Sequence, residues 1–139
     1  MTDRVFRLRS ATDQDLDAVM VLLGPLMEQR RLLERSAEQV SPLLGTGFVA
    51  VTGDQVIGFA AIEIYSSKLA EIQCLAVQSE WQQRGIGREL VEHCVEVARR
   101  EKVLEVMAIS ARDEFLVSCG FDYSLPGQKR ALFIQTRAN

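Results

Sequence analysis

The stretch at residues 70–90, AEIQCLAVQSEWQQRGIGREL, constrains the fold most, because it joins an apolar strand, a glycine turn and an amphipathic helix in one run. Residues 71–77 are mostly apolar, which is typical of a strand buried on both faces. Polar residues follow, and from Leu90 onward apolar side chains recur at helical spacing. The pattern therefore predicts a central strand followed by a helix that opens at Gly85 and Gly87.

The start of this helix is a candidate anion site. A helix N-terminus has about four N–H groups without intrahelical partners and carries roughly half a positive charge. Gly85 and Gly87 lack Cβ atoms and would let a diphosphate approach the amides, while Arg84 and Arg88 add positive charge. A Gly-x-Gly at a helix start is more often plain turn chemistry, so the motif alone leaves both interpretations open. Walker and dinucleotide sites are disfavoured, because no Walker lysine follows and Leu90 stands where a third glycine is needed.

The run resembles the acetyl-CoA-binding motif of the GNAT N-acyltransferase superfamily, R/Q-x-x-G-x-G/A after a strand, here Gln82-x-x-Gly85-x-Gly87. The resemblance implies acetyl-CoA as co-substrate, with main-chain groups of the strand on the pantetheine arm and the CoA diphosphate at the helix N-terminus. The residues implied to bind it are Leu75, Ala76, Val77, Gln82, Gln83, Arg84, Gly85, Ile86, Gly87 and Arg88.

Composition indicates one ordinary domain over residues 1–139, with 47% hydrophobic and 25% charged residues. The formal charge of −3 argues against nucleic acid as the main partner. No apolar run approaches the roughly 18 residues that a membrane span needs, so a cytoplasmic protein is expected. The three cysteines show no C-x-x-C spacing and His93 is the only histidine, so no metal site is expected.

The first third of the chain predicts a strand at 5–9 and a helix at 12–23, capped by Thr12 with Asp15 three residues on. Gly24-Pro25 is expected to end this helix, because proline removes a donor. Residues 26–33 then predict a second short helix or an irregular helical segment. Ser36 and Gln39 form another capping-box pattern ahead of a further helical turn.

The remaining elements predict an α/β (α+β) fold with a mixed central sheet of about six to seven strands and about four helices. A hairpin is expected from 48–52 and 56–65 around Gly53-Asp54. After the central strand come a helix at 87–102, a strand at 104–109, a helix at 112–119 with Gly120 at its C′ position, and strands at 121–124 and 131–136. This order is that of the GNAT fold, and residues 115–121, FLVSCGF, resemble the F-Y-x-x-x-G-F segment of that family.

The pattern is most similar to the acetyltransferase domain of bacterial N-acetylglutamate synthases, in its Gly-Pro-Leu break, LLERS at 32–36, AEI at 70–72 and LPG at 125–127. The amino-acid-kinase domain found there does not occur in these residues, so a stand-alone relative is expected. The resemblance implies that Arg35 helps to hold the substrate. The lysine of the third strand falls on Glu63, which would repel a dicarboxylic acceptor and puts glutamate in question.

Acyl transfer to an amine needs a base, because an amine with a pKa of about 10.4 is almost wholly protonated at pH 7. Glu71 aligns with the glutamate that is the general base in several GNAT enzymes; the alternative is a surface glutamate at a strand end. The acid that often protonates the CoA thiolate is a tyrosine, but Leu116 occupies its position, which leaves Ser118, Cys119, Tyr123 or water. A main-chain N–H near Leu75 or Ala76 would polarise the carbonyl.

The resulting hypothesis is an acetyl-CoA-dependent N-acetyltransferase that acts on the amine of a small molecule, namely an amino acid such as glutamate. Two alternatives remain open: a catalytically weak acyl-CoA-binding sensor or regulatory module, and a protein N-acetyltransferase. A homodimer is also expected as one option, because GNAT relatives often pair through sheet edges or final strands.

Overall fold

The computed structural model describes residues 5–110, 113–123 and 132–136. A five-stranded sheet in the order β1-β2-β3-β4-β5 lies at its centre, antiparallel from β1 to β4 and parallel between β4 and β5. The strands are β1 (Arg7–Ser10), β2 (Gly47–Thr52), β3 (Gln55–Ile64), β4 (Leu69–Val77) and β5 (Glu105–Met107). The helices are α1 (Leu16–Glu28), α2 (Ala37–Val40), α3 (Ile86–Arg100) and α4 (Asp113–Ser118). The mixed α/β fold predicted from the sequence is therefore confirmed.

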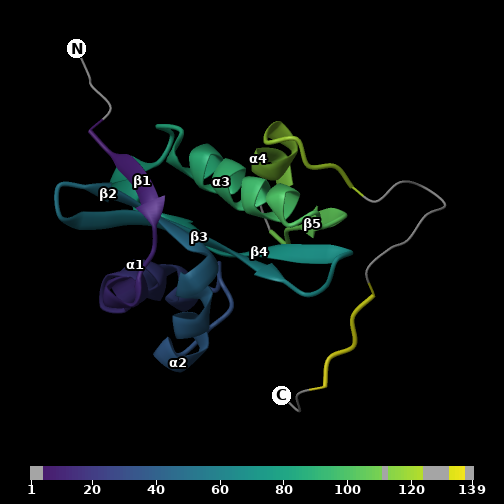
Figure 1. Ribbon diagram of the computed structural model, residues 1–139. Coiled ribbons are helices and arrows are strands. Elements are labelled where there is room, and N and C mark those ends of the chain that lie inside the picture. The colour runs from purple at the N-terminus through teal and green to yellow at the C-terminus, as the bar shows by residue number, and fades with distance from the viewer. Residues whose placement is uncertain (1–4, 111–112, 124–131, 137–139) are drawn as a thin grey trace.

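Helices cover both faces of the sheet, with α1 and α2 on one side and α3 and α4 on the other (Figure 1). Successive side chains from Phe59 to Ile62 of β3 enter two separate hydrophobic clusters, because neighbouring strand residues point to opposite faces of the sheet. Phe59 and Ala61 pack with Val19 and Leu23 of α1. Ile62 packs with the α3 side chains, of which Leu90 is fully buried. Each face of the sheet thus has its own core.

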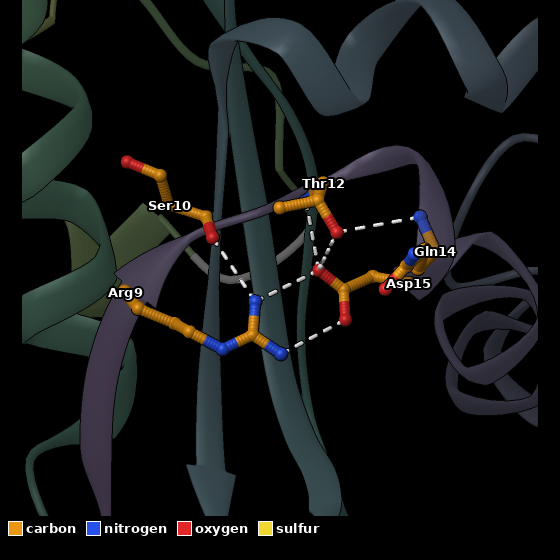
Figure 2. A network of polar contacts seen from close by, with 5 residues as sticks. All are labelled: Arg9, Ser10, Thr12, Gln14 and Asp15. Carbon is orange, nitrogen blue, oxygen red and sulfur yellow. Dashed lines mark hydrogen bonds and ion pairs between the residues drawn. The ribbon is translucent and has the colours of Figure 1, made fainter.

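The N-terminal capping box predicted at Thr12 is present, and it is joined to β1. Arg9 donates two hydrogen bonds of 2.9 Å to the carboxylate of Asp15, which also accepts one from the Thr12 amide at 2.8 Å (Figure 2). A short 3₁₀ turn at Asp13–Asp15 precedes α1. The second predicted box is also confirmed, because Ser36 and Gln39 exchange side-chain to backbone hydrogen bonds at the start of α2.

The prediction that Gly24-Pro25 ends the first helix is wrong, since α1 continues through Pro25 to Glu28. The carbonyl that loses its donor belongs to Val21, whose side chain is 77% exposed, so solvent can satisfy it. Leu22 and Leu26 meanwhile pack on the buried cluster and favour the continued helix. Of the two alternatives predicted for 26–33, the separate second helix is wrong: α1 includes these residues as far as Glu28, and the amide of Arg31 bonds to the carbonyl of Leu26, which closes α1.

The hairpin around Gly53 and the central strand are confirmed, with Thr52 paired to Gln55 across a two-residue turn. Gly120 ends α4 with a positive φ of 101°, as predicted. The two final strands are not formed in the described parts of their segments, 121–123 and 132–136, and the rest of both lies outside the described residues. A strand needs a ladder partner and a surface to pack on, and Leu132 is 92% exposed. Within the described residues, no helix is long and apolar enough to cross a membrane.

Candidate active site

Strand β4 is interrupted by a β-bulge at Cys74. Phe59 pairs with Ala76 and Ala61 pairs with Gln73, so Ala60 faces both Cys74 and Leu75. Cys74 has a φ of +59°, in the left-handed region that non-glycine residues seldom adopt. A bulge of this kind takes backbone groups out of the ladder and bends the strand. The main chain around Leu75 is consequently available to a ligand.

The other edge of β4 is open over most of its length. β5 pairs with β4 only from Leu69 to Glu71, and no other strand of the described chain lies along that edge. Beyond the bulge, this open edge runs over Leu75, Ala76 and Val77, the three strand residues expected to contact pantetheine. The backbone here can therefore bond an extended polar chain.

The glycine loop connects the end of β4 to α3. Gln82 donates from its side-chain amide to the Val77 carbonyl at 3.2 Å. Gln83 and Gly85 both have positive φ values, of 63° and 87°, and Gly85 is the N-cap of α3. The first amides of α3, beginning at Ile86, have no carbonyl of their own helix to bond. Left-handed residues followed by free helix amides make a concave donor surface for an anion.

Packing explains the second glycine of the motif. A Cβ at Gly87 would lie 3.2 Å from Cζ of Phe115, so the α4 aromatic ring rests directly on the first turn of α3. Arg88 donates at 3.0 Å to both the carbonyl and the hydroxyl of Ser118, at the other end of α4. Arg84 stacks over the ring of Trp81 at 4.5 Å. Both arginines are thus held beside the loop by their own chain.

A polar network lies on the α1/α2 face of the sheet, at the other end of β4 from the glycine loop. Gln73 is only 7% exposed, and its amide nitrogen is 3.1 Å from an oxygen of Glu63, of Glu71 and of Tyr65. The Tyr65 hydroxyl donates to Glu71 at 2.6 Å. On the other side, Arg35 donates to the Gln73 carbonyl oxygen at 2.5 Å. The structure therefore brings Arg35 and Glu71, two predicted site residues, into one network through Gln73.

The electrostatics of this network keep Tyr65 protonated. Enclosure of its hydroxyl, the hydrogen bond to Glu71 and the nearby charge of Glu63 together raise the pKa of Tyr65 to about 12. Burial also raises the pKa of the Cys74 thiol, against the opposing effect of Arg35. Tyr65 is consequently a hydrogen-bond donor at neutral pH, and Cys74 is a neutral thiol next to the network.

Val77 lies six positions along the strand from Glu71, roughly 20 Å at the usual rise per residue. The bulge lies between these two ends. The network containing Glu71 and the loop containing Gly85 therefore do not touch each other, and a ligand that used both would have to extend along β4.

Ser118 and Tyr123, two of the residues considered as acids for the CoA thiolate, already donate to other groups of the chain. Leu116 is 6% exposed and packs in the core. Ser118 donates its hydroxyl proton to the Phe115 carbonyl, and Tyr123 donates to Asp113. Cys119 is half-buried. Within the described residues, no group of three or more His, Cys, Asp or Glu could hold a metal ion.

Gln73 and Tyr65 were not identified as site residues from the sequence. The sequence does contain a sign of Gln73, because it is the one polar side chain between Ile72 and Val77. It also lies two residues from Glu71, and therefore on the same face of the strand. Tyr65 had none, since its position depends on the register of β3 against β4. The φ of Cys74 likewise could not be deduced, because cysteine has no preference for the left-handed region.

The mixed sheet, the interrupted β4 and the glycine loop at the start of α3 define an N-acyltransferase. The chain belongs to the acetyltransferase (GNAT) family, which matches residues 16–121. It is 36% identical over 114 residues to an uncharacterised N-acetyltransferase of Chlorobaculum tepidum, covering 82% of this chain and 74% of the relative.

Two further comparisons concern longer proteins. The chain is 27% identical over 131 residues to the amino-acid acetyltransferase of Aeromonas salmonicida, covering 90% of this chain and 30% of the relative. Its fold matches an N-acetylglutamate synthase from Neisseria gonorrhoeae, solved with coenzyme A and N-acetyl-glutamate, with a TM-score of 0.81 and 27% identity over 89% of this chain. Here too the chain spans 30% of the neighbour's length.

Proposed function

We propose that this chain transfers the acetyl group of acetyl-CoA to the amine of a free amino acid. The observation that carries the proposal is β4, where the bulge at Cys74 and the open edge lie between Glu71 and the glycine loop. The amino-acid class of acceptor is supported by the names of the relatives, and by the N-acetyl-glutamate bound to the Neisseria neighbour.

On the cofactor side, the diphosphate binds the first amides of α3 and the loop before it, as at other helix N-termini. Gly85 supplies the left-handed turn, and Arg84 and Arg88 add positive charge. The pantetheine arm then runs along the main chain of Leu75, Ala76 and Val77. Its thioester reaches the bulge, where a backbone N–H stabilises the oxyanion.

On the acceptor side, the carboxylate binds Arg35 and the amine lies towards Glu71. Glu71 takes one amine proton, directly or through water, and the nitrogen then attacks the thioester carbon. A C–N bond forms and the C–S bond breaks. The thiolate leaves, and because a simple thiol has a pKa near 8.5, it can take its proton from water without a dedicated acid.

The test is calorimetric titration with acetyl-CoA followed by thiol release against a panel of amino acids. Gly85→Ala should weaken acetyl-CoA binding, because alanine is strained at a φ of +87°. Glu71→Gln should lower kcat by roughly 10²–10⁴-fold with unchanged acetyl-CoA affinity, as expected for loss of a general base. Glu92→Gln, an exposed change on α3, is the matched control. Unchanged kinetics in Glu71→Gln would remove the role of this residue.

A second candidate is an acyl-CoA sensor with little catalysis. It is favoured by Leu116, a buried aliphatic side chain that provides no proton for the thiolate. This candidate predicts tight acetyl-CoA binding without thiol release on any amine, so the same titration separates the two functions.

A further inference from the structure

Glu63 and Glu71 face each other directly across β3 and β4. They are register partners in the antiparallel ladder, and one oxygen of each lies 3.1 Å from the same nitrogen of Gln73. Like charges directly opposite on a sheet oppose folding. The Gln73 amide and the Tyr65 hydroxyl offset this repulsion by donating to the pair.

The donors of the network are fewer than its acceptors. Gln73 has two amide hydrogens and Tyr65 one hydroxyl hydrogen, and all three point to the Oε1 atoms or to the tyrosine oxygen. The Oε2 atoms of Glu63 and Glu71 accept no hydrogen bond from the described part of the chain. What this surface still offers to a ligand is negative charge and free acceptor atoms.

Arg35 is the complementary element. Only its Nη2 atom donates to Gln73, and its Nε and Nη1 atoms have no partner among residues 5–110, 113–123 and 132–136. The Arg35 guanidinium can therefore still donate to the carboxylate of a ligand. The Oε2 atoms of Glu63 and Glu71 can still accept from its positively charged groups. With Arg35 counted, the three ionised side chains sum to one net negative charge.

We propose that Glu63 makes the preferred acceptor a diamino acid: its carboxylate binds Arg35, one amine reacts at Glu71, and the second stays as an ammonium group on Glu63. This inference rests on the proposed function and specifies its substrate class. The second carboxylate of a dicarboxylic amino acid would meet Glu63, and Arg35 is the one guanidinium that bonds this network within residues 5–110, 113–123 and 132–136. Specificity here would come from repulsion of the wrong group as well as attraction of the right one.

The experiment compares kcat/KM of the full chain for lysine, ornithine, norleucine and glutamate at saturating acetyl-CoA. Norleucine is the neutral control of similar length to lysine. The diamino acids should exceed norleucine by about tenfold or more, as a close charge pair at the protein surface allows, and glutamate should be slowest. Glu63→Gln should reduce the ratio of lysine to norleucine towards one, and Glu63→Lys should shift the preference towards glutamate. Glu92→Gln, on the opposite face, should leave every ratio unchanged.

A preference of the unsubstituted chain for glutamate, or a lysine to norleucine ratio that Glu63→Gln does not change, would overturn the proposal. The proposed function fails separately, if no amine gives thiol release. In that case calorimetric binding of lysine and glutamate in the presence of CoA still decides the role of Glu63. Tighter lysine binding that depends on Glu63 supports it, and equal or absent binding of both overturns it. Thermal melting of each variant checks that it is folded.

Discussion

Phe115 of α4 lies on Gly87 so closely that a Cβ at residue 87 would be 3.2 Å from its ring. Gly87 lies in the first turn of α3, which is proposed to bind the CoA diphosphate, and Phe115 lies in α4, the helix after β5. Residue 87 is therefore glycine because α3 and α4 pack closely there. Residue 85 is glycine for a different reason, because its φ is positive.

Gly87→Ala should lower the free energy of unfolding by about 1–2 kcal/mol, the lower part of the usual range for overpacking, and should weaken acetyl-CoA binding. Denaturant melts and calorimetry measure the two effects. Gly45→Ala is the matched control: this glycine is exposed and nothing lies within 4 Å of the added Cβ, so the free energy of unfolding should change by less than about 0.5 kcal/mol. Phe115→Leu in the Gly87→Ala background should restore part of the loss. Absence of any loss in Gly87→Ala would refute the packing argument.

Asp15→Asn should destabilise the chain by roughly 1–2 kcal/mol at pH 7, a value reduced because the Arg9 side chain is 40% exposed. Hydrogen bonds from Arg9 hold the pKa of Asp15 below its usual value. The stability that this shift provides is complete above the unfolded pKa of about 3.9 and is lost as pH falls through the lower folded pKa. Melting temperatures should therefore fall more steeply below pH 4 in the unsubstituted chain than in Asp15→Asn. Parallel curves would contradict the linkage.

Lys102→Gly should stabilise the chain by up to about 1 kcal/mol. Lys102 ends α3 with a φ of +59°, where the amide of Val103 bonds to the carbonyl of Ala98. A lysine in the left-handed conformation costs about 1–2 kcal/mol of backbone strain, which glycine removes. The net gain is smaller than this strain, because glycine loses more conformational entropy on folding. Arg100→Gly, two residues earlier and still helical, should instead destabilise by about 1 kcal/mol. Urea melts of the pair measure the difference, and equal effects would argue against the cap.

Burial, and then the hydrogen bond to Glu71 and its charge, raise the pKa of Tyr65 to about 12 in the folded chain. Glu71→Gln should therefore lower that pKa part of the way towards its ordinary value of about 10, because the carboxylate is removed and the burial remains. The tyrosinate absorbance, measured in a Tyr123→Phe background, reports Tyr65 alone, because the chain has two tyrosines. The raised pKa means that stability from this group is complete below pH 10 and is lost as pH rises towards 12. If the pKa of Tyr65 were the same in Glu71→Gln, the hydrogen bond between Tyr65 and the proposed base would be refuted.

Elements specified by short-range chemistry could be predicted from the sequence. Thr12 with Asp15 and Ser36 with Gln39 fix their helix starts within four residues, and Gly53 fixes the hairpin turn. The end of α1 was mispredicted, because tertiary packing of Leu26 outweighs the missing donor of Pro25.

The candidate site divides in the same way. The glycine loop is a local motif and could be recognised, as could Glu71 through its place in the strand. Tyr65 and Gln73 join Glu71 only because β3 and β4 pair in one register. The bulge that sets that register depends on the left-handed conformation of Cys74. No local sequence pattern predicts this bulge.

The two separate cores on the faces of the sheet have a consequence for how such a chain could change over evolutionary time. Gln73 pairs with Ala61, which packs in the cluster under α1, so the network of Arg35, Glu63 and Gln73 belongs to the α1/α2 face. The glycine loop leads into α3, which packs on the other face. Substitutions that refit one face leave the packing of the opposite face in place, since the backbone of the sheet separates them. A lineage could therefore acquire a new acceptor by altering a few side chains on one surface while inheriting its coenzyme chemistry intact.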